Sequence, residues 1–232
     1  MTCPHSEPGP TVSTDRPRRL FSRFYARISK RLEAEGMAGL RTELLSGLTG
    51  RVVEVGAGNG MNFTHYPDPV TRVVAIEPEP FLRSLATQVA RTASTVVTVQ
   101  AGTADRLPLP DDSVDAAVLC LVMCSLDDRS AALAELARVL RPGGVLRFLE
   151  HTIADTPGLR RVQRVADATV WPLLAGGCHT ATDPVGAITT AGFDVTACRR
   201  LRFPEARFTQ PSSPHVLGSA RAPSSSAWSR VV

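Results

Sequence analysis

The first regular pattern of apolar positions has the period of a helix. It predicts a helix over 19–36, carried by the apolar positions Leu20, Phe21, Phe24, Ile28 and Leu32. A second helix is expected to run to about Ser46, where Gly47 closes it. Residues 1–18 hold Pro, Ser, Thr and Gly without an apolar stretch, so we expect a disordered lead-in that is not a signal peptide.

Short apolar runs then alternate with helical stretches. The runs that predict strands lie at 51–55, 72–76, 96–100, 114–122 and 145–149. Helices are expected at 81–91 and 129–140, the second capped by Asp127 or Asp128 and stopped by Pro142-Gly143-Gly144. The run 114–122 is apolar on both faces, as in a central parallel strand. This alternation predicts a parallel sheet with helices on both faces.

The pattern changes after Glu150. A helix is expected over 159–170, and Asp183-Pro184 begins another that ends at Gly192. Two last strands are expected at 193–201 and 215–220, and the Ser-rich residues 222–232 should form a loose tail.

Composition narrows the class of protein. Hydrophobic residues make up 43% and charged residues 21% of 232 residues, which is ordinary for a globular chain. The net charge is +4, and because Lys30 is the only lysine, nearly all of the basic residues are arginines. This preference for arginine suggests codon bias in the genome more than a binding site for an anionic partner. Basic residues gather between Arg16 and Arg31, but aromatic residues do not interleave with them, so we expect no nucleic-acid partner.

Five cysteines are present, an odd number whose spacing fits no metal motif, so we expect neither a metal site nor disulfides. Cysteines without disulfides favour a location in the reducing cytoplasm. No run of about 18 apolar residues occurs, so we expect no membrane span.

A glycine-rich turn carries the candidate chemistry. The apolar run ending at Val55 leads into Gly56-Ala57-Gly58-Asn59-Gly60. Glycines here allow positive φ and leave room for a ligand, and a helix beginning after them would point its N–H groups at that ligand. The NAD fingerprint wants glycine or alanine where this chain has Met61. Glu77, at the end of the second strand, suits the ribose hydroxyls of either a dinucleotide or another nucleoside.

These motifs together resemble those of the class I S-adenosylmethionine-dependent methyltransferases. The matching segments are 54–60, Glu77-Pro78, Leu107-Pro108 with 112–115, and 139–144. The resemblance implies a Rossmann-like α/β fold, with a seven-stranded, mostly parallel sheet and an antiparallel last strand. It also implies S-adenosyl-L-methionine as cofactor, bound by Glu54, Gly56, Ala57, Gly58, Gly60, Glu77, Pro78, Thr103, Ala104 and Leu121. Many relatives have aspartate where this chain has Thr103. Glu54 would orient the cofactor; a carboxylate capping a helix N-terminus is the alternative interpretation.

A narrower resemblance extends over most of the chain. Segments 121–125, 148–151, 171–174 with Gly177-Cys178, and 214–218 are similar to the methyltransferase-like 7 (thiol S-methyltransferase) branch. The resemblance implies a methyltransferase domain over 19–221, with lid helices over 19–47 and a substrate-side insertion over 152–182. The small-molecule acceptor should sit above the fourth and fifth strand ends, beneath the lid and the insertion.

Side chains near that place are candidates for contact with the acceptor: Tyr25, His151, Asp167, Trp171 and His179. His151 is the candidate catalytic residue, because a thiol or hydroxyl acceptor has to lose a proton. Cys178 is not expected to act as a nucleophile, since methyl transfer needs no covalent intermediate. Three alternatives stay open: a C- or O-methyltransferase of quinone-like aromatics, an NAD-binding oxidoreductase, and a non-catalytic adenosyl-binding protein.

Overall fold

A computed structural model describes residues 19–169, 171–204 and 210–223 of the chain. The lead-in expected at 1–18 and most of the tail expected at 222–232 lie outside these ranges. Over the described ranges, none of the helices combines the length and the apolar character that crossing a bilayer requires.

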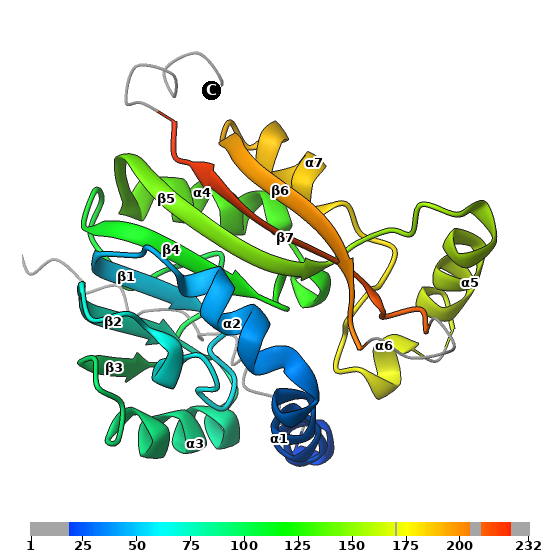
Figure 1. The fold of residues 1–232 in the computed structure, drawn as a ribbon, viewed down its shortest axis with the longest axis horizontal. Helices are drawn as coiled ribbons and strands as arrows, with labels where there is room; N and C mark the ends of the chain where they lie inside the picture. The colour runs from blue at the N-terminus through cyan, green and yellow to red at the C-terminus, as the bar shows by residue number, and fades with distance from the viewer. Residues whose placement is uncertain (1–18, 170, 205–209, 224–232) are drawn as a thin grey trace, which may run out of the picture.

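The described strands form one sheet in the order β3-β2-β1-β4-β5-β7-β6 (Figure 1). The strands are β1 (Gly50–Val55), β2 (Val70–Ile76), β3 (Val97–Gln100), β4 (Val114–Cys120), β5 (Leu140–His151), β6 (Asp194–Arg202) and β7 (Pro214–Arg221). Strands β1 to β5 pair in parallel, and β7 lies antiparallel between β5 and β6. The predicted Rossmann-like sheet, with its last strand antiparallel, is therefore confirmed.

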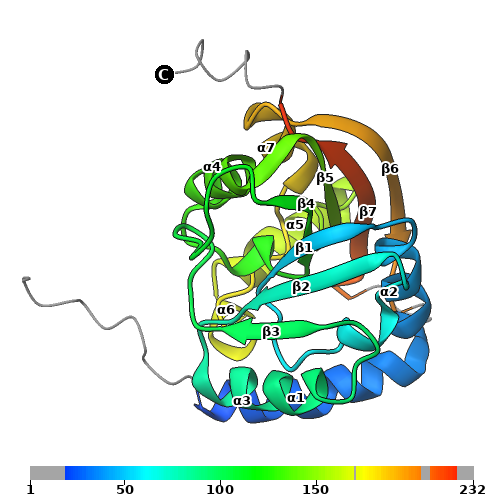
Figure 2. The same cartoon turned by 90° about the vertical axis from the view of Figure 1, so that its left-hand side faces the viewer.

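Helices cover both faces of the sheet (Figures 1 and 2). They are α1 (Arg19–Leu32), α2 (Ala38–Leu45), α3 (Pro80–Ala90), α4 (Arg129–Val139), α5 (Pro157–Asp167), α6 (Trp171–Leu174) and α7 (Pro184–Thr190). On one face Leu44 and Leu45 of α2 pack in a cluster with Val52 of β1. On the other face Leu133 of α4 and Ile188 of α7 pack in a second cluster, which includes alternate side chains of the same strands. As predicted, Asp128 caps α4 and Asp183 caps α7.

The N-terminal helix is shorter than predicted. It ends at Leu32 and continues as a π-helical turn, η1 (Glu33–Met37), before α2 begins. Gly36 has a φ of 121°, which interrupts the helical path. This break gives α1 and α2 different directions, so α1 leaves the sheet surface toward the carboxyl ends of the strands (Figure 1).

The prediction of a helix directly after the glycine-rich turn is wrong. The chain forms only a 3₁₀ turn, η2 (Phe63–His65), before β2. Pro67 and Pro69 follow at once and leave too few residues with backbone N–H groups for an α-helix. The turn therefore has no helix N-terminus to direct at a ligand.

The fourth strand ends two residues earlier than predicted. Leu121 has a φ of +59°, which turns the chain out of β4 and into a 3₁₀ turn, η3 (Met123–Ser125). A positive φ is costly for a leucine and occurs where the surrounding structure enforces it. In the folded chain Leu121 N–H donates to the Leu149 carbonyl oxygen at 2.8 Å, which fixes this turn beside β5.

Candidate functional site

The three glycines of the turn after β1 have different surroundings. All have positive φ, at 70° for Gly56, 56° for Gly58 and 81° for Gly60. A Cβ at Gly56 would lie 2.5 Å from Cγ2 of Val122, and a Cβ at Gly60 would lie 2.8 Å from the Phe63 ring. Gly56 and Gly60 are thus needed for packing within the protein. Gly58 faces α1 instead.

Glu77 joins the end of β2 to the glycine-rich turn. Its buried carboxylate accepts a hydrogen bond from Gly58 N–H at 2.7 Å and another from Glu79 N–H at 2.9 Å. Burial raises the pKa of Glu77, and the two backbone N–H groups oppose that rise. Each carboxylate oxygen keeps further acceptor capacity for a hydroxyl group.

The remaining residues predicted to bind the cofactor follow the ends of β2, β3 and β4. Pro78 is exposed beside Glu77, and Ala104 is buried after β3. Thr103 is partly buried, and its backbone pairs with Arg106 in an isolated bridge. Leu121 lies where β4 ends, so the structure places the whole predicted set along one edge of the sheet.

Glu54 is the centre of a buried polar network. Its carboxylate accepts hydrogen bonds from Asn62 Nδ2 at 2.9 Å and from the Tyr66 hydroxyl at 2.7 Å. Burial raises the pKa of Glu54 to about 7, against the lowering effect of these hydrogen bonds and of Arg41. Because its described partners are side chains, the carboxylate does not cap a helix.

Arg41 of α2 extends this network beneath the turn. Its side chain donates to Glu33 at 2.9 Å, to Asn62 Oδ1 at 2.7 Å and to Cys120 Sγ at 3.3 Å. Arg41 is a buried residue, and its positive charge lowers the pKa of Glu54. The carboxyl ends of β1 and β4 are therefore bridged through one arginine.

Helix α1 lies against the glycine-rich turn. A Cβ at Gly58 would lie 3.1 Å from Cε1 of Tyr25, and Asn59 Nδ2 donates to the Ser29 hydroxyl at 3.0 Å. The buried Asn59 Oδ1 has no hydrogen-bond partner among the described residues. Burial raises the pKa of Tyr25 to about 12, so its phenol is neutral and can donate a hydrogen bond.

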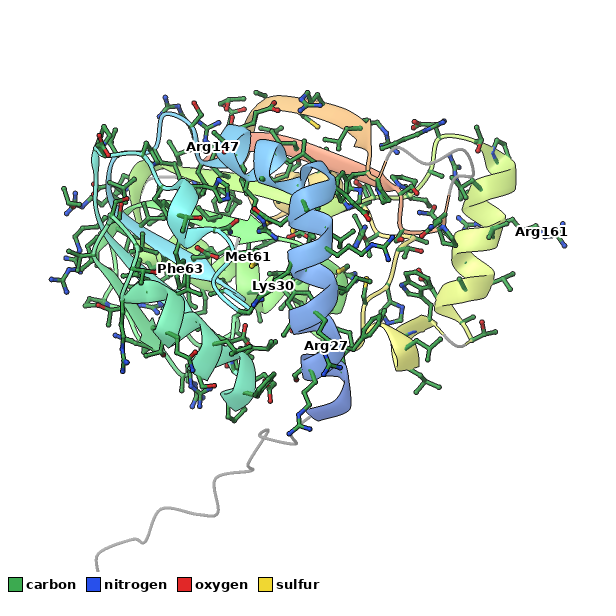
Figure 3. The ribbon with its side chains drawn as sticks, turned by 60° about the horizontal axis from the view of Figure 1, so that its bottom comes forward. Arg27, Lys30, Met61, Phe63, Arg147 and Arg161 are labelled. Atoms are coloured by element: carbon green, nitrogen blue, oxygen red, sulfur yellow. The ribbon has the colours of Figure 1, made fainter. Side chains whose placement is uncertain are left out.

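A groove of about 410 Å³ opens between α1 and α3 beside this turn. Arg27 and Lys30 of α1 line it together with Asn59 and Met61, and Figure 3 shows Lys30 and Met61 on this side of the molecule. Phe81 and Leu85 of α3 form much of its apolar wall. The groove reaches the turn from the molecular surface.

A cluster of sulfur and imidazole groups lies at the end of β5 and in the segments after β4 and α6. Cys124 in η3, His151 at the end of β5 and Cys178 after α6 each place one donor atom within 4.8 Å of the others. The buried Nδ1 of His151 and the buried Nε1 of Trp171 have no hydrogen-bond partner of good geometry in the described chain. Cys178 N–H and His179 N–H donate to carbonyl oxygens of Ala175 and Cys124, at 3.2 and 2.8 Å.

Electrostatic interactions within this cluster favour a charged sulfur. The pKa of Cys178 is lowered to about 5, chiefly by the neighbouring Cys124 thiol, with His151 and Trp171 adding to the effect against burial. The pKa of Cys124 is raised well above its usual value by Cys178 and by burial. His215 lies next to this group, its ring 4.4 Å from that of His151, and burial lowers its pKa to about 3.

Two of the predicted acceptor contacts have other surroundings. The Asp167 carboxylate accepts hydrogen bonds from Thr180 N–H, the Thr180 hydroxyl and Ala181 N–H, at 2.8, 3.1 and 2.8 Å, so it holds the loop after Cys178. His179 is exposed. The structure brings His151 and Trp171 together with Cys178, and it places Tyr25 at the glycine-rich turn.

Sequence reasoning gave no site role to several residues that shape the site: Arg41, Asn59, Tyr66, Cys120 and Cys124. Tyr66 stands directly before Pro67, and the two prolines at 67 and 69 were a usable signal that the segment after the turn is a short connection and not a long helix. Arg41 and Cys124 lie in other elements, and no spacing rule connects them with Glu54 or His151.

A family model and a similar human protein that match this chain are both described as methyltransferases. A family model described as "Methyltransferase domain" matches residues 53–148. The human protein "Thiol S-methyltransferase TMT1A" is 33% identical over 198 residues, which cover 80% of this chain and 80% of the relative.

Solved structures share the fold at lower identity. A structure described as a SAM-dependent methyltransferase from Methanosarcina mazei superimposes with a TM-score of 0.58 at 21% identity, covering 75% of this chain and 92% of that one. The structure of the "[4+2]-Cyclase SpnF" gives a TM-score of 0.65 at 20% identity, covering 82% and 81%. Because one fold carries both descriptions, the fold by itself leaves the chemistry open.

Proposed function

Because the chain belongs to the family of S-adenosylmethionine-dependent methyltransferases, we propose that its acceptor is a small thiol, methylated on sulfur. One observation carries this choice: the cluster of His151, Cys124 and Cys178 at the ends of β4 and β5. An imidazole can take a proton, so this cluster fits an acceptor whose thiol has to lose its proton before the sulfur attacks the methyl group. The name of the human relative is consistent with the same acceptor class.

The residues of the glycine-rich turn fit the cofactor. Glu77 has acceptor capacity left for the ribose hydroxyls, and Gly58 leaves the turn without a side chain where α1 covers it. The unpartnered Asn59 Oδ1 is an acceptor for an ammonium or hydroxyl group of the cofactor. Glu54 lies behind the turn, and its carboxylate favours the cofactor's positive charge when it is ionised, which its pKa of about 7 makes easier as the pH rises above neutrality.

Helix α1 acts as a lid in this proposal. Tyr25 covers Gly58, and the hydrogen bond between Ser29 and Asn59 ties the helix to the turn. Entry of the cofactor requires Tyr25 to move away from Gly58, after which its ring can pack against the bound molecule and exclude water. We accordingly assign 19–47 to the lid and 152–182 to the acceptor side of a domain spanning 19–221.

When bound, S-adenosylmethionine supplies a methyl group on a positively charged sulfur, which leaves as a neutral thioether. The protein then has to align the acceptor with that methyl group and take the acceptor's proton. The lone pair of the acceptor sulfur forms the new bond to carbon as the old carbon–sulfur bond breaks. His151 lies where the acceptor's proton is released, because β5 ends beside the turn that follows β4.

The four described cysteines are all unpaired thiols. This state suits a chain working in the reducing cytoplasm, the compartment that we propose.

The acceptor class is tested by direct product analysis. Purified protein with S-adenosylmethionine is offered a small thiol, a phenol of similar size and a primary amine, and the methylated products are identified by mass spectrometry. We expect a methyl thioether together with one S-adenosylhomocysteine per turnover. Methylation of the phenol with none of the thiol would disprove the proposed acceptor.

A binding measurement checks the cofactor site separately. Glu77→Ala should weaken S-adenosylhomocysteine binding about 10- to 100-fold in calorimetry, the effect of losing a hydrogen bond to a charged group. Glu43→Ala is the matched control, because Glu43 is a surface carboxylate paired with Arg199. Equal affinities in the two variants would contradict the role given to Glu77.

A further inference from the structure

Three potential metal ligands converge on the acceptor side of the site. Cys124, His151 and Cys178 come from three separate elements, and their donor atoms lie within 4.8 Å of one another. Donor atoms around a tetrahedral zinc ion are about 3.5 Å apart, given metal–ligand bonds of about 2.0 to 2.3 Å. A movement of about one ångström would therefore complete a three-ligand site.

The chemistry of the donors selects the metal. Two thiolates with one imidazole form a soft set that zinc prefers over magnesium or calcium. The nearest carboxylate, Glu150, is already engaged by Val122 N–H at 3.0 Å and Met123 N–H at 3.1 Å. It stays behind the cluster, buried, and holds the backbone of η3 in place.

An imidazole nitrogen of the cluster is unused. His151 Nδ1 is a buried nitrogen atom without a hydrogen-bond partner of good geometry in the described residues, and an unprotonated imidazole nitrogen can bind a metal ion. Most buried polar groups in folded proteins have a partner, so one that lacks a partner in the chain is a candidate for contact with a ligand. The Trp171 indole N–H interacts with Cys178, and because it can only donate, it would hydrogen-bond the metal-bound thiolate and not the ion itself.

We propose that Cys124, His151 and Cys178 bind one zinc ion with a fourth position open toward the acceptor. Three protein ligands with one open position are characteristic of catalytic rather than structural zinc. An acceptor thiol entering the open position binds as a thiolate and releases its proton to solvent, since metal coordination deprotonates thiols. In the zinc-bound protein His151 is therefore a metal ligand, and the zinc ion replaces it as the group that promotes loss of the acceptor's proton. The role of the open position rests on the proposed thiol acceptor, whereas zinc binding itself does not.

The backbone explains why these residues can form a site without a recognisable spacing. His179 N–H donates to the Cys124 carbonyl oxygen at 2.8 Å, so the loop carrying Cys178 is fastened to η3. Thr182 Oγ1 donates to the His151 carbonyl oxygen at 2.9 Å, which fastens the same loop to β5. Both contacts bring the insertion onto the ends of β4 and β5.

The test measures metal content without cofactor or acceptor. The full chain, purified without chelators, should retain about one zinc ion per molecule. Cys124→Ser, Cys178→Ser and His151→Gln should each reduce zinc affinity at least about 100-fold, whereas Cys198→Ser should not. Cys198 is the matched control, an exposed thiol on β6 remote from the cluster. Unchanged S-adenosylhomocysteine binding shows that each variant is folded.

Replacing zinc by cobalt allows the proposed metal site to be tested by absorption spectroscopy. Cobalt-loaded wild-type protein should show thiolate-to-metal charge-transfer bands, and an added small thiol should change them by entering the open position. Equal zinc affinity in the wild type and in the three single variants would overturn the proposal, as would a Cys124–Cys178 disulfide in the protein as purified. Loss of thiol methylation with zinc binding intact would count against the proposed acceptor alone.

Discussion

Individual glycines in this protein have opposite effects on stability according to their surroundings. Gly60 has a φ of 81°, and a Cβ there would lie 2.8 Å from the Phe63 ring and 3.2 Å from the Ala86 backbone. Gly39, in contrast, is an exposed position inside α2 with nothing within 4 Å of its Cβ site. Replacing each glycine by alanine therefore tests two different effects: steric contact and backbone strain at Gly60, and the conformational entropy of the unfolded chain at Gly39.

Gly60→Ala should lower the free energy of unfolding by about 2–4 kcal/mol, through backbone strain and the close contacts. Gly39→Ala should raise it by about 0.5–1 kcal/mol, because alanine loses less entropy in a helix. Urea denaturation of the two variants beside the wild type measures both effects. A stabilising Gly60→Ala would show that the turn after β1 is not packed as described.

At the scale of elements, the insertion between β5 and β6 is organised by two side chains of α5. Gln163 Oε1 accepts from Ala154 N–H at 2.8 Å, and its Nε2 lies 3.1 Å from the carbonyl oxygens of Thr152 and Thr180. Asp167 accepts three hydrogen bonds from residues 180–181. Polar anchors of this kind fix a segment whose helices bury few apolar side chains.

Asp167→Asn should loosen the loop that carries Cys178. The amide nitrogen would face a backbone N–H group, so the loop loses about 1–3 kcal/mol of local stability. Hydrogen exchange should become faster over residues 171–182 and stay unchanged in β1 to β4. Asp155→Asn is the control, since Asp155 is an exposed carboxylate paired with Arg200 at 3.0 Å. Equal hydrogen-exchange rates over residues 171–182 in the two variants would show that Asp167 does not anchor this loop.

Across the whole molecule, buried carboxylates make stability depend on pH. Burial raises the pKa of Glu54 to about 7, although Tyr66, Asn62 and Arg41 oppose the rise. Folding therefore binds a proton at pH values between the unfolded value of 4.5 and about 7. The stability associated with the protonated carboxyl is complete below this range and is lost as pH rises through it.

Glu54→Gln should consequently become more stable relative to the wild type as pH rises from about 5 to 8, by on the order of 1–3 kcal/mol. Glu150, whose pKa burial also raises to about 7, is present in both proteins, so the difference between them isolates Glu54. Urea denaturation at several pH values measures it. A difference that does not vary with pH would refute the raised pKa of Glu54.

The sequence by itself determined the α/β class, the order of the main strands and helices, and the N-cap at Asp183, and it limited the N-cap of α4 to Asp127 or Asp128. These features depend on local periodicity and on capping side chains a few residues away, which the chain carries regardless of its final packing. The positive φ of the glycine-rich turn was predictable for the same reason. The resemblance placed Glu77 and the turn at a cofactor site because their spacing along the chain is short and regular.

Only the tertiary structure decided which distant groups meet. Cys124, His151 and Cys178 form a cluster because η3, the end of β5 and the insertion pack together, and no periodicity records that contact. Leu121 turns out of β4 with a positive φ beside Leu149 of β5, a neighbour in space and not in the local sequence. Interactions between elements depend on shape and burial summed over the whole fold, and a single sequence does not show them.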